Sequence, residues 1–110
     1  MPSGGRPIIE ETALAANKTS DTIKADAVSG FSLVYYWTGT LLGTLKLQCR
    51  NNERRAFVDV NGATFPTSPN GGAGNDELVI NDARHKEYQV VFTFTSGSGD
   101  LTIDHWSKSD

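Results

Sequence analysis

The sequence is short of cysteine, of excess basic residues and of long hydrophobic runs. Cys49 is its only cysteine, so no disulfide can form within the chain and no cysteine-based metal site is expected. The 10 Lys and Arg residues are outnumbered by 13 Asp and Glu residues, and the resulting net charge of −3 argues against nucleic acid as a partner. No apolar run approaches the roughly 18–20 residues that a membrane span needs, and residues 1–20 lack the pattern of a signal peptide. We therefore expect a protein made in a reducing cytoplasm, with no membrane and no nucleic acid among its partners.

Residues that could carry out chemistry are few and poorly placed. His85 lies in a polar turn, and His105 follows Asp104 directly, so in a strand these two neighbours would point to opposite faces. Cys49 alternates with leucines, which is the position of a small core residue rather than of a nucleophile. We expect no catalytic residue, no metal ligand and no cofactor, and a function that is not enzymatic.

The segment GGAGNDELV, residues 71–79, matches one repeat of the calcium-binding β-roll at every specified position. A β-roll holds each ion between stacked repeats and needs roughly three copies, whereas this sequence has one. Glycines permit positive φ, and the Asn75-Asp76 pair favours a turn. The composition of a long loop therefore explains the match, and we interpret residues 71–76 as the end of a loop without a calcium site, followed by a short strand at residues 77–80.

From residue 22 onward, short segments rich in aromatic and β-branched residues alternate with turn signals. Residues 31–37 place four aromatic or aliphatic side chains on one face, residues 43–50 alternate Leu and Cys with polar residues, and residues 88–95 and 101–106 continue the pattern. Such alternation is typical of antiparallel sheets with one buried and one solvated face. We predict an all-β chain that folds as a single antiparallel β-sandwich of the jelly-roll type, in which segments 31–37 and 43–50 pair as a hairpin across the intervening glycines.

Residues 1–20 contain few large apolar side chains and begin with Pro, Ser and Gly. They predict a flexible, extended N-terminal arm, with the β-sandwich domain covering residues 21–110. Ile8, Ile9 and Leu14 are the apolar residues through which such an arm would dock on a partner.

The predicted faces leave some apolar residues pointing outward, among them Tyr36 and Trp106. Exposed aromatic side chains on one surface mark contact sites. An equally good interpretation is that the arm or a loop of the same chain covers them. Together with Ile8, Ile9 and Leu14 they form the set of predicted partner-binding residues.

The segments WTGTLLGTLKLQCRNN, residues 37–52, and YQVVFTFTSGSGDL, residues 88–101, carry a resemblance to a known family. The first matches a W-T-G-T-x-x-G-T-L-K-L-Q pattern and the second an aromatic strand followed by a T-S-G-x-G turn. On these motifs the chain resembles small β-sandwich structural proteins of tailed bacteriophages, over about residues 30–106. It departs from that pattern after Gln48. The resemblance implies a virion setting and no catalytic residue.

The expected function is that of a non-enzymatic virion structural protein, above all a capsid decoration or cement protein made in the host bacterial cytoplasm. Its partners would be the major capsid protein or other virion subunits, and a homo-oligomer is expected. The alternative is a tail or fibre module that binds host-surface carbohydrate through Tyr36, Trp106 and the loop of residues 66–76.

Overall fold

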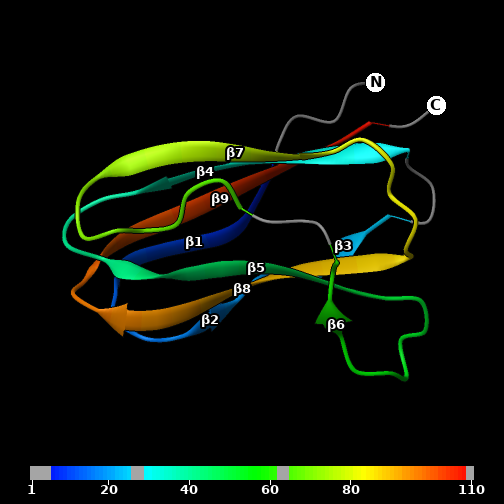
Figure 1. Cartoon of the computed structure of the whole chain (residues 1–110), viewed down its shortest axis with the longest axis horizontal. Coiled ribbons are helices and arrows are strands. Elements are labelled where there is room, and N and C mark those ends of the chain that lie inside the picture. The colour runs from blue at the N-terminus through cyan, green and yellow to red at the C-terminus, as the bar shows by residue number, and fades with distance from the viewer. Residues whose placement is uncertain (1–5, 26–28, 62–64, 109–110) are drawn as a thin grey trace.

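The computed structural model describes residues 6–25, 29–61 and 65–108, and these ranges contain nine strands and no helix (Figure 1). Every strand pairing is antiparallel. The strands are β1 (Arg6–Leu14), β2 (Lys18–Thr19), β3 (Ile23–Lys24), β4 (Gly30–Trp37), β5 (Leu42–Arg50), β6 (Val58–Asp59), β7 (Gly74–Ile80), β8 (Glu87–Ser96) and β9 (Gly99–Lys108). The predicted all-β class is confirmed.

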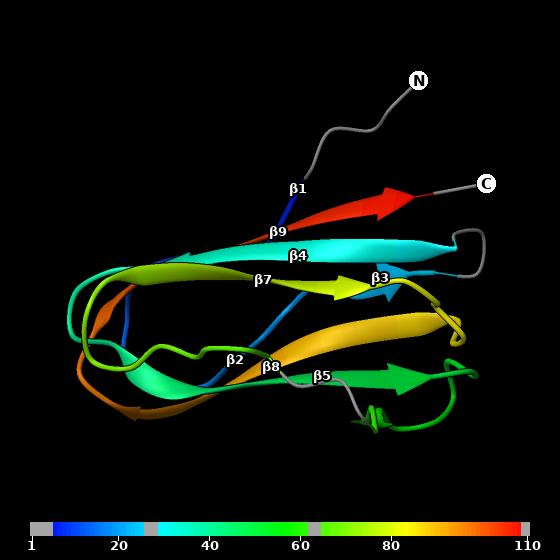
Figure 2. The same ribbon diagram turned by 45° about the horizontal axis from the view of Figure 1, so that its top comes forward.

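Two sheets pack face to face. Sheet A has the strand order β1-β9-β4-β7, and sheet B has the order β2-β8-β5-β6, with β3 also paired to β8. Figure 2 shows the two layers, with β4, β7 and β9 in one and β5 and β8 in the other. The chain winds between the sheets as the strands of a jelly roll do, so the predicted β-sandwich is also confirmed.

The sandwich is built from one long antiparallel ribbon folded across its middle. One arm of the ribbon is β4 followed by β5, and the other is β8 followed by β9. The pairs between β4 and β9 run from Gly30↔Lys108 to Trp37↔Leu101, and those between β5 and β8 run from Leu42↔Ser96 to Arg50↔Glu87. A single register shift, between Leu42 and Gly43, interrupts this run.

The two arms remain hydrogen-bonded where the ribbon bends, at residues 38–41 and 97–99. The Thr38 amide donates to the Asp100 carbonyl at 3.0 Å, and the Asp100 amide donates to the Thr38 hydroxyl at 3.0 Å. Thr40 and Ser98 repeat this exchange. The Thr40 amide donates to the Ser98 carbonyl at 2.9 Å, and the Ser98 amide donates to the Thr40 hydroxyl at 3.2 Å. The threonine hydroxyls thus replace the ladder partners that the bend removes, and no amide in these pairs is left unpaired.

This geometry corrects the predicted hairpin. β4 and β5 do not pair with each other, because residues 38–41 carry the chain from sheet A to sheet B instead of reversing it within one sheet. Figure 1 shows this crossing, and the β8–β9 crossing beside it, at one end of the molecule.

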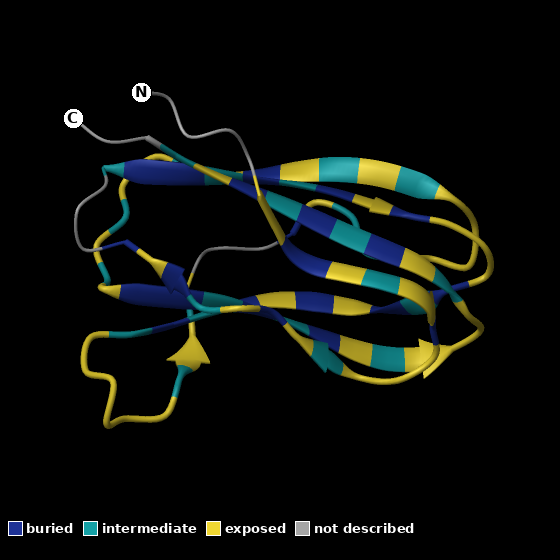
Figure 3. Ribbon diagram, turned by 180° about the vertical axis from the view of Figure 1, so that it is seen from behind, coloured by how far each residue is buried: buried dark blue, intermediate teal, exposed yellow. Residues whose placement is uncertain are grey.

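The core lies between the inner faces of the two sheets, where buried and exposed residues alternate along the strands (Figure 3). The inward positions predicted for segments 31–37, 43–50 and 101–103 are confirmed, and Phe65 anchors the loop before β7 by packing edge-on to Tyr35 at 5.4 Å. The largest fully buried side chains are those of Tyr35, Phe92, Ile9, Ile23, Leu33, Leu41, Leu47, Leu101, Ile103, Val90 and Pro69.

The prediction of an N-terminal arm is wrong for the part of residues 1–20 that the structure describes. Residues 6–14 form β1, which pairs with β9 at the edge of sheet A, and residues 18–19 form β2 in sheet B. Ile8, Ile9 and Leu14 are buried in the chain's own core, so they are not free to dock on a partner. Residues 1–5 lie outside the described ranges. The sandwich therefore includes residues 6–20, and the predicted boundary at residue 21 does not hold.

Ile9→Ala is expected to lower the free energy of unfolding by roughly 2–5 kcal/mol, because it removes a side chain that is 1% exposed. Glu10→Ala, the next residue and exposed, is expected to change it by less than about 0.5 kcal/mol. Urea denaturation of both variants measures the difference. Equally small changes in the free energy of unfolding for the two variants would support a flexible N-terminal arm instead of β1.

Gly97→Ala is expected to lower the free energy of unfolding by more than about 3 kcal/mol. Gly97 has φ 76°, a conformation that costs other residues roughly 1–2 kcal/mol, and an added Cβ would lie 1.9 Å from the Thr40 carbonyl oxygen. Gly71 is the matched control, because it has φ 94° but open space around it, so Gly71→Ala should cost only about 1–2 kcal/mol. Similar losses in the two variants, by urea denaturation, would show that the close approach at the bend does not matter.

Candidate functional site

Tyr36 and Trp106 both lie on the outer face of sheet A. Their exposed fractions are 43% and 44%, so the described residues leave both side chains accessible to a partner. Val79, at 48%, is on the same face. Three of the four large exposed apolar side chains in the described ranges therefore gather on one surface, and Val58 on β6 is the fourth.

The strand register arranges this face in three rows across β7, β4 and β9. The rows are Val79–Ser32–Trp106, Glu77–Val34–Asp104 and Asn75–Tyr36–Thr102. Two rows that each carry an aromatic residue thus flank a middle row with two carboxylates. None of the nine residues is a Lys or an Arg, so the surface presents aromatic groups and negative charge together.

The outer face of sheet B has a different character. Lys46 and Gln48 bind the Asp59 carboxylate at 3.3 and 3.0 Å, and Gln89 donates to Gln48 at 2.9 Å. The hydrogen bonds from Gln48 and then Lys46 hold the pKa of Asp59 below its ordinary value. The polar side chains on the outer face of sheet B thus hydrogen-bond to one another, as is typical of a solvated face. The outer face of sheet A is therefore the better candidate for a contact surface.

Tyr36 and Trp106 lie at opposite ends of the sheet A face. Tyr36 pairs with Thr102, four residues from Trp106 along β9, which corresponds to a separation of about 13 Å along the strand. The loop of residues 66–76 does not bridge them. The half-buried Asp76 carboxylate turns toward Thr67, and hydrogen bonds from the Thr67 hydroxyl and then from the Glu77 amide hold its pKa below the ordinary value. The structure thus does not bring the two aromatics together around one small ligand.

Six of the nine residues in the segment that resembles a calcium repeat, residues 74–79, belong to β7. Gly74, Asn75 and Asp76 open β7 instead of belonging to the loop as predicted. Gly74 packs under Trp37, whose ring would lie 2.6 Å from an added Cβ, so a side chain there would displace the indole. In the ranges that the structure describes, no group of three or more His, Cys, Asp or Glu residues could hold a metal ion.

His105 and Cys49 lie on the inner faces where the alternation places them. His105 is buried against Phe31, with ring centroids 5.6 Å apart, and its Nε2 lies 3.0 Å from the Ser107 hydroxyl. Burial, and then the positive charge of Arg6, lower the pKa of His105. Cys49 is buried, which raises the pKa of its thiol and keeps it in the unreactive protonated form.

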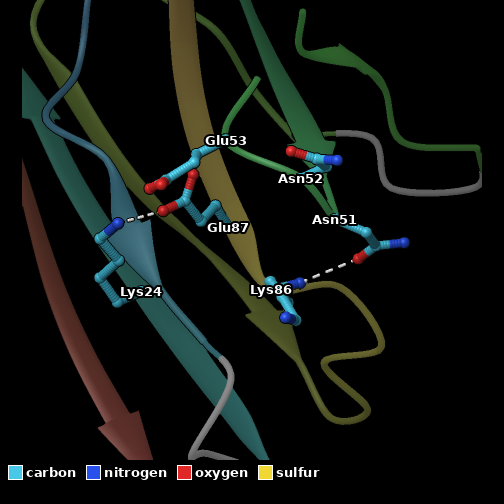
Figure 4. Close-up of a pocket in the computed structure, with 6 residues that line it drawn as sticks. All are labelled: Lys24, Asn51, Asn52, Glu53, Lys86 and Glu87. Carbon is cyan, nitrogen blue, oxygen red and sulfur yellow. Dashed lines mark hydrogen bonds and ion pairs between the residues drawn. The ribbon is translucent and has the colours of Figure 1, made fainter. Parts of the chain in front are cut away.

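A polar pocket of about 450 Å³, which the sequence did not predict, lies where β3, β5 and β8 meet (Figure 4). It is lined by Lys24, Asn51, Asn52, Glu53, Lys86 and Glu87. Glu87 is 6% exposed, and its carboxylate forms ion pairs with Lys24 and, at 2.6 Å, with Arg50. Hydrogen bonds from Lys24 and then Arg50 lower the pKa of Glu87. The buried charge of the pocket is thus neutralised within the chain, so we interpret this cluster as structural.

No protein-family model, curated protein or solved structure matches the chain. The motifs in the sequence, the fold and the surface are therefore the basis for any functional assignment. In the described part of the chain, no helix is long and apolar enough to cross a membrane.

The ion pairs of Glu87 predict a dependence of stability on pH. Because its folded-state pKa is below the ordinary value of 4.5, its contribution to the free energy of unfolding is complete above that pH and is lost as the pH falls through the lowered value. Glu87→Gln should therefore flatten the fall in stability below pH 4.5 and lower stability at pH 7. Glu77→Gln, which removes a carboxylate from the exposed face of β7, is the control. Unfolding in urea across pH 2–7 measures both, and parallel pH profiles for Glu87→Gln and the unmodified protein would contradict the assignment.

Proposed function

We propose that the chain is a non-enzymatic structural protein of a tailed-bacteriophage virion, most specifically a capsid decoration protein, that binds its partner through the outer face of sheet A. The observation that carries this proposal is the gathering of Tyr36, Trp106 and Val79 on that one face. Aromatic side chains are enriched in protein interfaces and contribute much of their binding energy.

The motifs that resemble phage β-sandwich proteins support the proposal in a second way. Residues 37–52 and 88–101 lie far apart in the sequence, but their W-T-G-T and T-S-G-x-G parts meet at the bend of the ribbon. Thr38 and Thr40 of the first motif make the hydrogen bonds at the bend, and Gly97 and Gly99 of the second motif lie so close that an added Cβ would be 1.9 and 1.8 Å from the carbonyl oxygens of Thr40 and Thr38. The residues that carry the resemblance are thus the ones that close the fold, which is a reason for their joint occurrence in proteins of this architecture.

The partner would be the major capsid protein or a neighbouring virion subunit, with assembly in the host cytoplasm. Attachment through Ile8, Ile9 and Leu14 is no longer part of the proposal, because these residues are needed in the core. The remaining contact surface is a rigid sheet face, so docking would change its backbone little.

Binding of a host-surface carbohydrate is the second candidate function. The row Asn75–Tyr36–Thr102 favours it, since an exposed aromatic ring lies between an amide and a hydroxyl group, the groups that contact the faces and the hydroxyls of a sugar. Trp106 lies outside this row. Glycan-array binding that Tyr36→Ala abolishes and Trp106→Ala leaves intact would favour this function over docking on a virion.

Tyr36→Ser and Trp106→Ser are each expected to weaken rebinding to stripped virions by roughly 10- to 100-fold, the effect of removing an interface aromatic worth about 1.4–2.8 kcal/mol. Val58→Ser is the matched control, because Val58 is 60% exposed but lies on sheet B. Mass spectrometry of separated heads and tails first shows which part of the virion contains the protein. Co-sedimentation with stripped virions then measures the affinity of each variant. If all three variants bind as the unmodified protein does, the outer face of sheet A is not the interface.

A further inference from the structure

The two edges of sheet A differ in how far they are protected against an additional strand. On the β1 edge, Pro7 lacks an amide hydrogen, two register shifts interrupt the pairing with β9, and Ala13 has φ 51°. Prolines, bulges and twists of this kind are the devices by which proteins prevent unwanted strand pairing. The β1 edge is therefore closed.

The β7 edge has none of these devices. All seven residues from Gly74 to Ile80 pair with β4 without a register shift, and the segment contains no proline. In Figure 2, β7 is the last strand of its layer, and no described strand follows it. No described strand pairs with the side of β7 that points away from β4, although the Glu77 amide already donates to the Asp76 carboxylate at 2.8 Å.

A pocket of about 430 Å³ lies beside the second half of this strand. Leu78, Val79 and Ile80 of β7 line it from sheet A, while Val60 and Tyr88 line it from the side of sheet B. Because no residue of β4 lines the pocket, it lies toward the free side of β7. Alternate side chains of a strand added to β7 would point toward sheet B and enter this space.

One wall of the pocket contains an unsatisfied polar atom. The His85 amide donates to the Tyr88 hydroxyl at 3.2 Å, but the buried Nδ1 atom of the His85 ring has no hydrogen-bond partner in the described part of the chain. Buried polar atoms without a partner are rare and costly. The pocket is thus bounded by apolar groups, by the polar or charged residues Asn61, Asn81, Asp82 and Arg84, and by one buried ring nitrogen without a partner among the described residues.

The charge of the outer face indicates what could occupy the edge. Glu77 of β7 lies in the middle row with Asp104 and without a cation. If a second copy of β7 paired in the register that matches all seven residues, Glu77 would lie opposite its own counterpart, and like charges in that position are destabilising. A strand with Lys or Arg on its outer side would instead complement the carboxylate.

We propose that β7 is a strand-addition site, at which an extended basic segment of another protein continues sheet A. Main-chain hydrogen bonds to β7 hold the segment, an apolar side chain fills the pocket between Ile80 and Val60, and a Lys or Arg faces Glu77. This site lies at the edge of sheet A, where it shares Glu77 and Val79 with the outer face used in the proposed function, and it does not depend on a virion setting.

The test uses the full chain, labelled with nitrogen-15, and two nine-residue peptides in which Val alternates with Lys or with Glu. With the Lys peptide at about 1 mM, where a Kd of that order half-saturates a site, we expect slower hydrogen exchange at alternate amides of β7 and shifted signals of Ile80, His85 and Tyr88. The Glu peptide should bind at least about tenfold more weakly. Absence of these changes with the Lys peptide overturns the proposal.

Two variants that change the net charge by the same amount distinguish binding at β7 from a general attraction of a basic peptide to an acidic protein. Glu77→Lys should weaken binding of the Lys peptide by about tenfold or more and strengthen binding of the Glu peptide, because it reverses the charge beside the added strand. Glu10→Lys, on β1 at the opposite edge of sheet A, should alter both affinities by less than about threefold. Equal effects of the two variants would contradict the proposal. Protection of β7 in the protein alone, together with a dimer in light scattering that Glu77→Lys alters, would assign the edge to a second copy and also overturn it.

Discussion

The structure depends on a hydrogen-bonded ladder that continues through a bend. Residues 30–50 and 87–108 pair along nearly their whole length, and the hydrogen bonds donated by the backbone amides of Thr38, Thr40, Ser98 and Asp100 carry the pairing from sheet A to sheet B. Since a slip of one residue turns every side chain to the opposite face, a continuous ladder couples the register of one sheet to that of the other. The two halves of the core are therefore specified together. Leu41, fully buried at the bend, adds an apolar contact at the point where the layers separate.

Alternation in the sequence was enough to predict the strands and their inner faces, but not their partners. Alternation with a period of two residues predicts which face of a sheet each side chain is on. It does not predict which strand lies beside it. The glycines near residues 39 and 43 are compatible with a tight hairpin, and equally with the crossing that the chain makes. The decisive hydrogen bonds involve residues about 60 positions apart, at Thr38 and Asp100, which no local pattern contains.

The N-terminal strand was missed for a different physical reason. β1 contains two register shifts, one between Pro7 and Ile9 and one between Glu11 and Leu14, and these break the alternation of its side chains. Ile8 and Ile9 are both buried as a result, although neighbours in a regular strand face opposite sides. The bulges that close this edge of the sheet are the same features that conceal the strand from a periodicity argument. Glycine has a low β-propensity, which predicts a loop at Gly74. In the structure Gly74 begins β7, because the Trp37 ring packs against it and leaves no room for a side chain.

The candidate site could be predicted only in part. The outward positions of Tyr36 and Trp106 follow from alternation, and their exposure in the fold agrees with them. Their neighbours depend on the register across β7, β4 and β9, so the row of carboxylates between them could not be predicted from the sequence. The same holds for the cluster around Glu87, whose partners Lys24 and Arg50 come from different strands.

The central position of β9 determines when the protein can fold during synthesis. This strand lies between β1 and β4, although its residues are translated about 90 positions after the first and 70 after the second. While the ribosome is still adding residues, β1 has no partner in sheet A, and its buried isoleucines have no completed core to enter. Unpaired strands that wait in this way are prone to associate with other chains. Nascent chains are thus most vulnerable until β9 emerges, because sheet A cannot be completed before that strand is available.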